Sequence, residues 1–268
     1  MSDIDTPDQR PLDIIVWGAS GFTGRLVVEY LASRYPPGES LRWAVGGRNR
    51  EKLERALDDI QFPAERPEII VADGLDLASM RDMASRTRVV ITTVGPYAKY
   101  GSPLVQACAE SGTDYCDLAG ETQWIRRMID EHEETARESG ARILMSCAFD
   151  SVPSDIGVHV INREANRVHG KPCRSVRMLV RATKGTVSGG TTASILNVID
   201  EARSDRAIAR LLNDPYALSP DGERSGPDGR DQTNAMGDEH AGAGTGPCLM
   251  AGIITRTVRR TNALRDYP

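Results

Sequence analysis

Residues 12–24 read LDIIVWGASGFTG, and this stretch decides the fold. Its first six residues are mostly apolar without alternating, which is typical of a strand buried on both faces of a parallel sheet. Glycines follow at positions 18, 21 and 24, and a helical pattern begins at Arg25. Because glycine lacks a β-carbon, the backbone can turn tightly and approach a diphosphate, while the first amides of a helix attract its oxygens. The stretch therefore predicts a strand, a phosphate loop and a helix in succession.

The glycine spacing, G-x-x-G-x-x-G, is a variant of the usual G-x-G-x-x-G of dinucleotide-binding sites. A glycine motif alone is weak evidence, and a tight turn that binds nothing is the alternative. Its place between an apolar strand and an amphipathic helix favours a nucleotide. We therefore expect the diphosphate to lie against Gly18, Ala19, Ser20, Gly21, Phe22, Thr23 and Gly24.

Apolar runs alternate with helical patterns up to about residue 146. Further strands are expected at 41–45, 68–72, 89–94, 114–118 and 142–145, and helices at 25–34 and at 121–138, which Gly140 ends. Six strands joined by helical crossovers predict an α/β fold with a doubly wound parallel sheet of the Rossmann type. We assign residues 12–150 to this nucleotide-binding domain and residues 1–11 to a polar tail.

The pattern changes in residues 151–268. We predict helices at 151–167, 191–203 and 249–264, and a strand at 175–182. Residues 213–247 are rich in Gly, Pro and Asp and predict a mobile loop. One strand and a few helices do not close a second core, so this region is expected to be an incomplete second α+β domain.

The second strand runs into Gly46-Gly47-Arg48-Asn49-Arg50. A site specific for NAD usually has Asp or Glu here, which binds the ribose 2′-hydroxyl and would repel a 2′-phosphate. The planar guanidinium of Arg48 suits a phosphate instead, with Asn49 and Lys52 close by. The alternative is a solvated basic helix start. The missing acid favours NADP as the cofactor.

Two other strand ends supply candidate cofactor contacts. Asp73, after the third strand, either meets the adenine amino group or is an ordinary turn residue. After the fourth strand we expect the nicotinamide ribose to pass Val94, Gly95, Pro96 and Tyr97. Tyr97 either covers the ring, donates a proton or is a half-buried aromatic.

Composition excludes several classes. A net charge of -5 and 5% aromatic residues argue against nucleic-acid binding. Five scattered cysteines form no CxxC, and His132, His159, His169 and His240 are solitary, so no metal site is expected. The chain has no apolar stretch of membrane-spanning length, and its polar, acidic start is unlike a signal peptide. These features predict a cytoplasmic protein with free thiols.

Five motifs carry a family resemblance: GASGFTG at 18–24, GGR at 46–48, VGPY at 94–97, GTDYCDLAGE at 112–121 and FDSVPSD at 149–155. They resemble the saccharopine dehydrogenase-like oxidoreductases, most closely the mycobacterial trans-acting enoyl reductases, as do SGGT at 188–191, DPYALSP at 214–220 and RRTNAL at 259–264. The resemblance implies an NADP-dependent oxidoreductase that reduces lipid or polyketide enoyl thioesters. It also implies a small-molecule or carrier-bound substrate and a polyketide synthase or acyl carrier protein as partner.

The sequence also departs from the family. Ala148 stands where the family usually has Gly, and family members continue well beyond Leu264. We therefore expect a truncated reading frame, or a chain that another chain completes. A non-catalytic dinucleotide-binding module and an inactive fragment remain the alternatives to an enzyme.

No acid–base pair identifies the proton donor. Tyr97, Glu121 and Asp150 are the candidates. Placement in a first helical turn is the alternative for Glu121, and helix capping is the alternative for Asp150 and Ser151. The amides after Ser188 either hold a thioester oxygen or carrier phosphate, or begin a helix without binding anything.

The last predicted helix has arginines beside an apolar stripe: Arg256, Arg259, Arg260 and Arg265. The arginines either touch an anionic membrane surface or acidic carrier protein, or form a solvated face. The apolar stripe, if uncovered, predicts association into a homo-oligomer.

Overall fold

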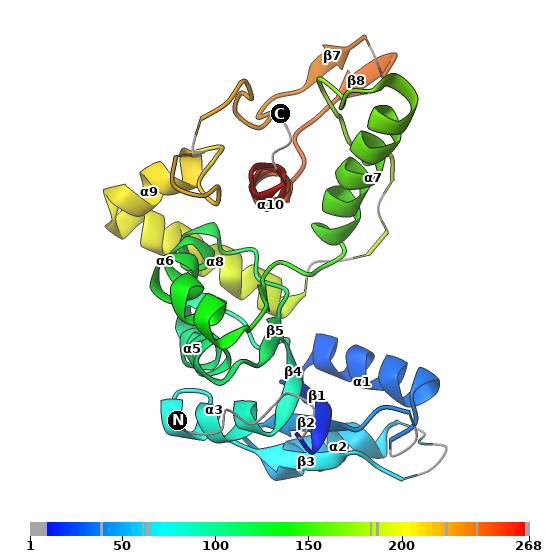
Figure 1. The fold of residues 1–268 in the computed structure, drawn as a ribbon, viewed down its shortest axis with the longest axis vertical. Coiled ribbons are helices and arrows are strands. Elements are labelled where there is room, and N and C mark those ends of the chain that lie inside the picture. Colours follow the sequence, from blue (N-terminus) through cyan, green and yellow to red (C-terminus); the bar gives the residue numbers. More distant parts are fainter. Residues whose placement is uncertain are drawn as a thin grey trace. The chain divides into compact units, whose positions relative to one another are not determined.

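The computed structural model describes residues 10–37, 40–60, 62, 65–182, 184–185, 188–222, 225–239 and 241–265. Most of the predicted polar tail (residues 1–9) and His240 lie outside these residues. The chain divides into two units (Figure 1). Unit 1 comprises residues 1–119 with 127–145, and unit 2 comprises residues 120–126 with 146–268.

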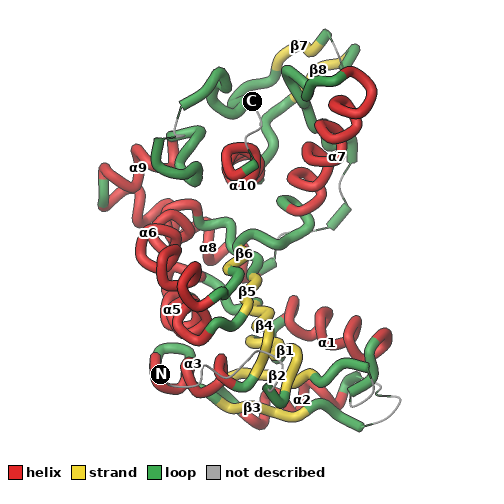
Figure 2. Tube along the Cα trace, viewed as in Figure 1, coloured by secondary structure: helices red, strands yellow, loops and turns green. Residues whose placement is uncertain are grey.

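Unit 1 contains a six-stranded sheet in the order β3-β2-β1-β4-β5-β6, with every neighbouring pair parallel (Figure 2). The strands are β1 (Leu12–Trp17), β2 (Trp43–Gly47), β3 (Glu68–Val71), β4 (Thr87–Thr92), β5 (Asp114–Cys116) and β6 (Ile143–Leu144). This order is that of a doubly wound dinucleotide-binding sheet and confirms the predicted fold.

Helices connect the strands and cover the sheet. They are α1 (Phe22–Arg34), α2 (Arg50–Asp58), α3 (Leu77–Ser85), α4 (Tyr97–Tyr100), α5 (Ser102–Ser111) and α6 (Thr122–Ser139), which includes residues of both units. Val28 of α1 and Leu53 of α2 share one buried cluster with Val16 of β1 and Val45 of β2. Because successive side chains of a strand alternate between faces, the fully buried Ile15 packs on the opposite face. This double coverage explains why Ile14–Trp17 of β1 are apolar without alternation.

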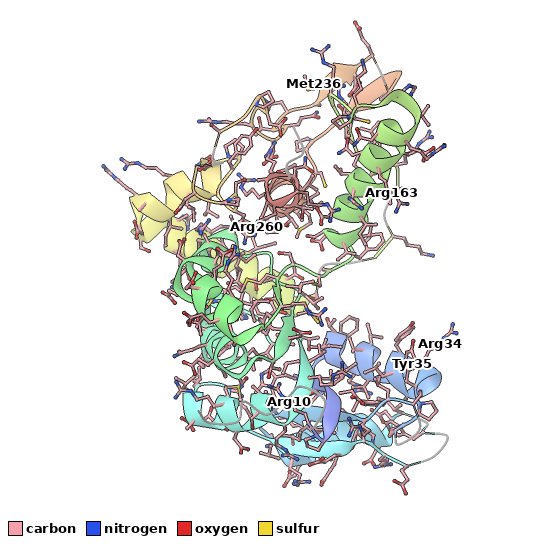
Figure 3. All side chains as sticks on the ribbon, in the orientation of Figure 1. Arg10, Arg34, Tyr35, Arg163, Met236 and Arg260 are labelled. Atoms are coloured by element: carbon pink, nitrogen blue, oxygen red, sulfur yellow. The ribbon has the colours of Figure 1, made fainter. Side chains whose placement is uncertain are left out.

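Arg10 fastens the start of the described chain to unit 1 (Figure 3). Its side chain is buried, and its guanidinium donates to the carbonyl of Thr87 at 2.6 Å and to the hydroxyl of Thr113. Since these two residues belong to β4 and to the turn before β5, the arginine links neighbouring parts of the sheet. Arg10 is thus part of the folded unit and not of a free tail.

Unit 2 contains α7 (Val152–His169), α8 (Gly189–Ser204), α9 (Arg206–Asn213), α10 (Ala251–Leu264) and an antiparallel pair, β7 (Met236–Asp238) with β8 (Ala243–Thr245). The predicted strand at 175–182 is wrong, since these residues form no ladder with any described strand. Met178, Leu179 and Val180 stay about half exposed. β-propensity alone does not make a strand without a partner for its backbone.

The prediction of a loop over residues 213–247 differs from the structure in two places. The β7–β8 hairpin lies within it, turning through Gly242 at φ +61°, and Ala217 and Leu218 are buried. Arginines of α10 hold this segment: Arg256 pairs with Asp231 at 2.9 Å, and Arg260 donates to the Leu218 carbonyl. The predicted solvated arginine face is therefore also wrong for Arg256, which is 5% exposed.

None of the helices in the described part of the chain has the length and apolar content that a membrane span requires.

Candidate functional site

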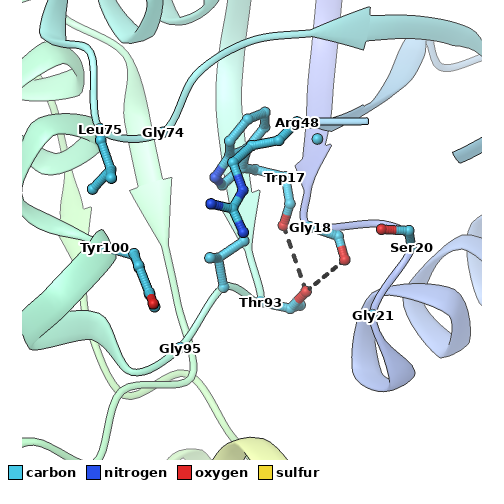
Figure 4. A pocket seen from close by; sticks show the side chains of 12 residues that line it. Trp17, Gly18, Ser20, Gly21, Arg48, Gly74, Leu75, Thr93, Gly95 and Tyr100 are labelled. Atoms are coloured by element: carbon cyan, nitrogen blue, oxygen red, sulfur yellow. Dashed lines mark hydrogen bonds between the residues drawn. The ribbon is translucent and has the colours of Figure 1, made fainter. Parts of the chain in front are cut away.

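A pocket of about 250 Å³ opens at the carboxyl ends of the unit 1 strands (Figure 4). It is lined by Trp17, Gly18, Ser20, Gly21, Gly47, Arg48, Gly74, Leu75, Thr93, Val94, Gly95 and Tyr100. These residues follow or end β1, β2, β3 and β4, or belong to α4. Doubly wound sheets bind nucleotides at this edge, on either side of the point where the strand order reverses.

The loop from β1 to α1 forms one wall, and its glycines are required by close contacts. Gly18 has φ +87°, and a β-carbon there would lie 2.5 Å from Val94 Cγ2. A β-carbon on Gly24 would overlap the carbonyl oxygen of Gly18. Gly21 is the N-cap of α1 and offers no side-chain acceptor to the first-turn amides. Those amides and the positive end of the helix dipole are therefore available to an anion.

Arg48 supplies the cationic side of the pocket. Its guanidinium carbon lies 5.9 Å from the centre of the Tyr100 ring (Figure 4). The next arginines in the sequence are paired, Arg50 with Glu54 and Arg55 with Glu51. Among the described residues Arg48 has no carboxylate partner. Its charge is therefore available to an anionic group in the pocket.

Asn49 and Lys52, which were also predicted to contact the cofactor after the second strand, lie outside the pocket lining. The side chain of Asn49 caps α2 by accepting from the amide of Lys52 at 2.9 Å. Their contact with a cofactor stays a prediction.

Asp73 closes the turn after β3. Its Oδ1 accepts from the amide of Leu75 at 3.0 Å, and its own amide donates to the Ser79 hydroxyl at 2.9 Å. The pocket is lined instead by Gly74 and Leu75, which this turn positions. The structure thus shows the turn role for Asp73, and the adenine contact stays a prediction.

The loop after β4 forms the wall next to the glycine loop. The hydroxyl of Thr93 lies within hydrogen-bonding reach of the carbonyl oxygens of Trp17 and Gly18, at 3.5 and 3.4 Å. Val94 and Gly95 line the pocket as expected, whereas Pro96, the N-cap of α4, does not. The two loops are therefore tied together at the floor of the pocket.

Tyr97 is buried next to this loop and does not line the pocket. Its hydroxyl donates to the Thr92 carbonyl and accepts from the Leu118 amide, both at 3.2 Å. The side chain thus joins the ends of β4 and β5. Proton donation by Tyr97 stays a prediction.

Tyr100, one turn further along α4, reaches the pocket instead and was missed by the sequence analysis, as were Trp17, Gly47, Gly74, Leu75 and Thr93. Position at a strand end was the signal available for five of these six residues.

The other two proton-donor candidates belong to unit 2. Glu121 is buried, and its Oε1 accepts from the Ser194 hydroxyl at 2.9 Å. The backbone carbonyl of Asp150 accepts from the Ser154 hydroxyl. Ser151 is the N-cap of α7 but makes no side-chain capping bond, so the predicted capping by its hydroxyl is absent. Ser188 does cap α8, by accepting from the Thr191 amide at 3.2 Å.

Tyr115 of β5 and Asp117, which follows this strand, form a buried pair, with the tyrosine hydroxyl 2.8 Å from Asp117 Oδ2. Burial raises the pKa of Tyr115 well above its usual value, and the negative charge of Asp117 raises it further. The tyrosine therefore stays protonated and serves as a hydrogen-bond donor.

None of the five cysteines, all of which the structure describes, forms a disulfide. The described residues contain no cluster of His, Cys, Asp or Glu able to hold a metal ion.

Residues 14–144, which build the sheet and the pocket, match the family described as the saccharopine dehydrogenase NADP-binding domain. This part of the chain belongs to that family. The matched range contains the glycine loop and Arg48, which line the pocket.

Nearly the whole chain is similar to mycobacterial proteins. A trans-acting enoyl reductase of Mycobacterium leprae is 39% identical over 269 residues, covering 98% of this chain, and one of Mycobacterium ulcerans is 38% identical over 270 residues, covering 97%. A related Mycobacterium tuberculosis protein is 40% identical over 269 residues. The chain spans only 64%, 63% and 63% of these relatives, respectively. Among solved structures, apo saccharopine dehydrogenase of Saccharomyces cerevisiae shares 18% identity at a TM-score of 0.46, covering 58% of this chain and 32% of that one.

Proposed function

We propose that unit 1 binds NADP(H) in this pocket and that the chain is an NADP-dependent oxidoreductase. The observation that carries the proposal is Arg48, a cation without a carboxylate partner in the described chain, which lines the same pocket as the glycine loop. NAD sites usually have an acid at the end of the second strand. A guanidinium there would instead bind a 2′-phosphate, which distinguishes NADP from NAD.

The residues present fit this cofactor. Because Gly18 and Gly24 have no β-carbon, the glycine loop can pack closely against the loop after β4 and against its own backbone. The uncapped first turn of α1 would hold the diphosphate. Arg48 would hold the 2′-phosphate, and the backbone of Val94 and Gly95 would lie beside the nicotinamide ribose. When bound, the reduced nicotinamide supplies a hydride.

For the substrate we propose an α,β-unsaturated thioester of a lipid or polyketide intermediate, carried by a small molecule or an acyl carrier protein. The names of the mycobacterial relatives support this class. Reduction adds hydride to the β-carbon and a proton to the α-carbon, so the site must also stabilise an enolate oxygen. Glu121 and Asp150 of unit 2, with Tyr97, remain the proton-donor candidates.

Titration of the purified chain with NADPH and NADH tests the first part. We expect NADPH to bind more tightly, and Arg48→Asp to weaken NADPH by tenfold or more while changing NADH little, because a charge-assisted hydrogen bond contributes about 1.5–3 kcal/mol. Arg55→Asp is the matched control, because Arg55 lies on the neighbouring helix α2 but outside the pocket lining. Equal weakening of both nucleotides by Arg48→Asp would contradict the 2′-phosphate assignment.

The second part is tested by following NADPH oxidation with an enoyl thioester. Turnover that needs the thioester supports the reductase. Tight NADPH binding with no turnover on enoyl thioesters would instead leave the chain a nucleotide-binding module. A folded chain that binds neither nucleotide would overturn the whole proposal.

A further inference from the structure

Arg48 and Tyr100 approach the pocket from different elements. Arg48 follows β2, whereas Tyr100 is the last residue of α4, and both side chains face the same hollow (Figure 4). The guanidinium carbon lies 5.9 Å from the ring centre. A cation within about 6 Å of an aromatic ring centre is attracted by the electrons of its face.

Of the two partners, the tyrosine is the fixed one. Its amide donates to the Pro96 carbonyl at 3.2 Å, and the following Gly101 amide donates to the Tyr97 carbonyl at 2.7 Å. The buried Tyr97 holds the same short helix to the ends of β4 and β5 through its two hydrogen bonds. Tyr100 is half-buried, while Arg48 is exposed. The ring is therefore carried by an anchored backbone, and the exposed Arg48 side chain lies against it.

An arginine side chain loses rotamer freedom when it is fixed on a phosphate, and a pre-ordered guanidinium loses less. Arg48 has no carboxylate in the described chain to order it, since the glutamates of α2 are paired with Arg50 and Arg55. The ring of Tyr100 is the contact that the structure provides for this purpose.

We propose that Tyr100 is a positioning residue for Arg48 and a determinant of the preference for a nucleotide with a 2′-phosphate. The inference rests on the proposed function, because it concerns the same pocket. The ring holds the guanidinium over the pocket before the nucleotide arrives, and the 2′-phosphate then meets an ordered cation. NADH has no phosphate at this position and gains nothing from the ordering.

The test compares NADPH and NADH dissociation constants by calorimetry for the wild type, Tyr100→Leu and Tyr100→Phe. Tyr100→Leu should raise the NADPH constant about two- to fivefold and leave NADH unchanged, as expected for an exposed cation–π contact. Tyr100→Phe keeps the ring and should retain the wild-type ratio. Tyr30→Leu is the control, because Tyr30 lies exposed on α1 and does not line the pocket.

A second comparison uses the Arg48→Ala background, where Tyr100→Leu should no longer change the NADPH-to-NADH ratio. Equal weakening of both nucleotides by Tyr100→Leu would overturn the inference, because the ring would then merely pack against the nucleotide. Tighter NADPH binding would overturn it too, since the ring would then compete with the phosphate for Arg48. In either case wild-type NADPH binding would leave the proposed function standing, whereas its absence would reject both.

Discussion

Gly18→Ala tests whether the phosphate loop needs glycine for its backbone conformation or for the space around it. Gly18 has φ +87°, and an added β-carbon would lie 2.5 Å from Val94 Cγ2 and 3.0 Å from Thr93 Oγ1. Gly140, in the same unit, has nearly the same conformation at φ +81° but nothing within 4 Å of its β-carbon position. The two alanine variants therefore share the backbone strain and differ in the overlap.

The magnitudes follow from these two terms. A left-handed conformation costs a non-glycine residue about 1–2 kcal/mol, which is all that Gly140→Ala should lose. Overpacking a well-filled site costs a further ~1–3 kcal/mol, which applies to Gly18→Ala alone. We therefore expect the free energy of unfolding to fall by about 2–5 kcal/mol in Gly18→Ala, and the variant to bind NADPH more weakly because its loop must move.

Urea unfolding of both variants, followed by tryptophan fluorescence, measures the difference, with NADPH titration as the second readout. The slope of the unfolding free energy against urea should match the wild type, which shows that the comparison concerns stability. If the two variants lose the same stability, the overlap with the loop after β4 does not matter and the reasoning is refuted. Weaker NADPH binding in Gly140→Ala would refute it as well.

Two further predictions concern single substitutions in unit 1 and unit 2. Gly24→Ala should destabilise the protein although Gly24 is helical, because its β-carbon would overlap the Gly18 carbonyl. Gly157→Ala in α7, where nothing lies within 4 Å of the β-carbon position, should be neutral or stabilise the protein by up to ~1 kcal/mol. Urea unfolding compares the stability of the two variants. Burial raises the pKa of the Asp155 carboxyl above its ordinary value of 3.8, although the hydrogen bond from the Thr261 hydroxyl lowers it. The folded state therefore binds this proton more tightly than the unfolded state does. As a result, the free energy of unfolding falls as pH rises above 3.8. Asp155→Asn should therefore melt at a higher temperature than the wild type at pH 7, with the difference shrinking towards pH 4; a difference independent of pH would contradict this assignment.

The sheet of unit 1 was predictable because its signals are local. Strands such as Leu12–Trp17 are buried on both faces, so their apolar residues run together. Glycine or a side-chain capping residue stands before several helices, as Gly21, Asn49 and Asp76 do before α1, α2 and α3. Strand ends shifted by only a few residues: the predicted strand at 89–94 is Thr87–Thr92 in the structure. The order of the strands follows from crossover connections that nearly always have one hand.

Unit 2 was less predictable because its structure depends on pairing between distant residues. Residues 175–182 have the composition of a strand but no described strand to pair with. Met236–Asp238 and Ala243–Thr245, by contrast, pair with each other, and Gly242 lies in the turn with φ +61°. A partly buried ion pair of Arg256 with Asp231, 25 positions apart, holds a segment whose composition predicts mobility. Neither contact leaves a periodic pattern in the sequence.

The two tyrosines of α4 show the limit of predicting site residues from their position next to a strand end. Tyr97 and Tyr100 are three positions apart, so a helix places them near the same face, and the residue nearer to the end of β4 is the natural candidate for contact with the cofactor. In the structure Tyr97 is buried, and its hydroxyl bonds to backbone groups at the ends of β4 and β5. Tyr100 is therefore the tyrosine of α4 that lines the pocket. The choice depends on acceptor and donor groups supplied by Thr92 and Leu118, which the sequence alone does not bring together. A position next to a strand end therefore predicts that a residue lies near the ligand, while the hydrogen bonds of its neighbours decide whether it faces the ligand.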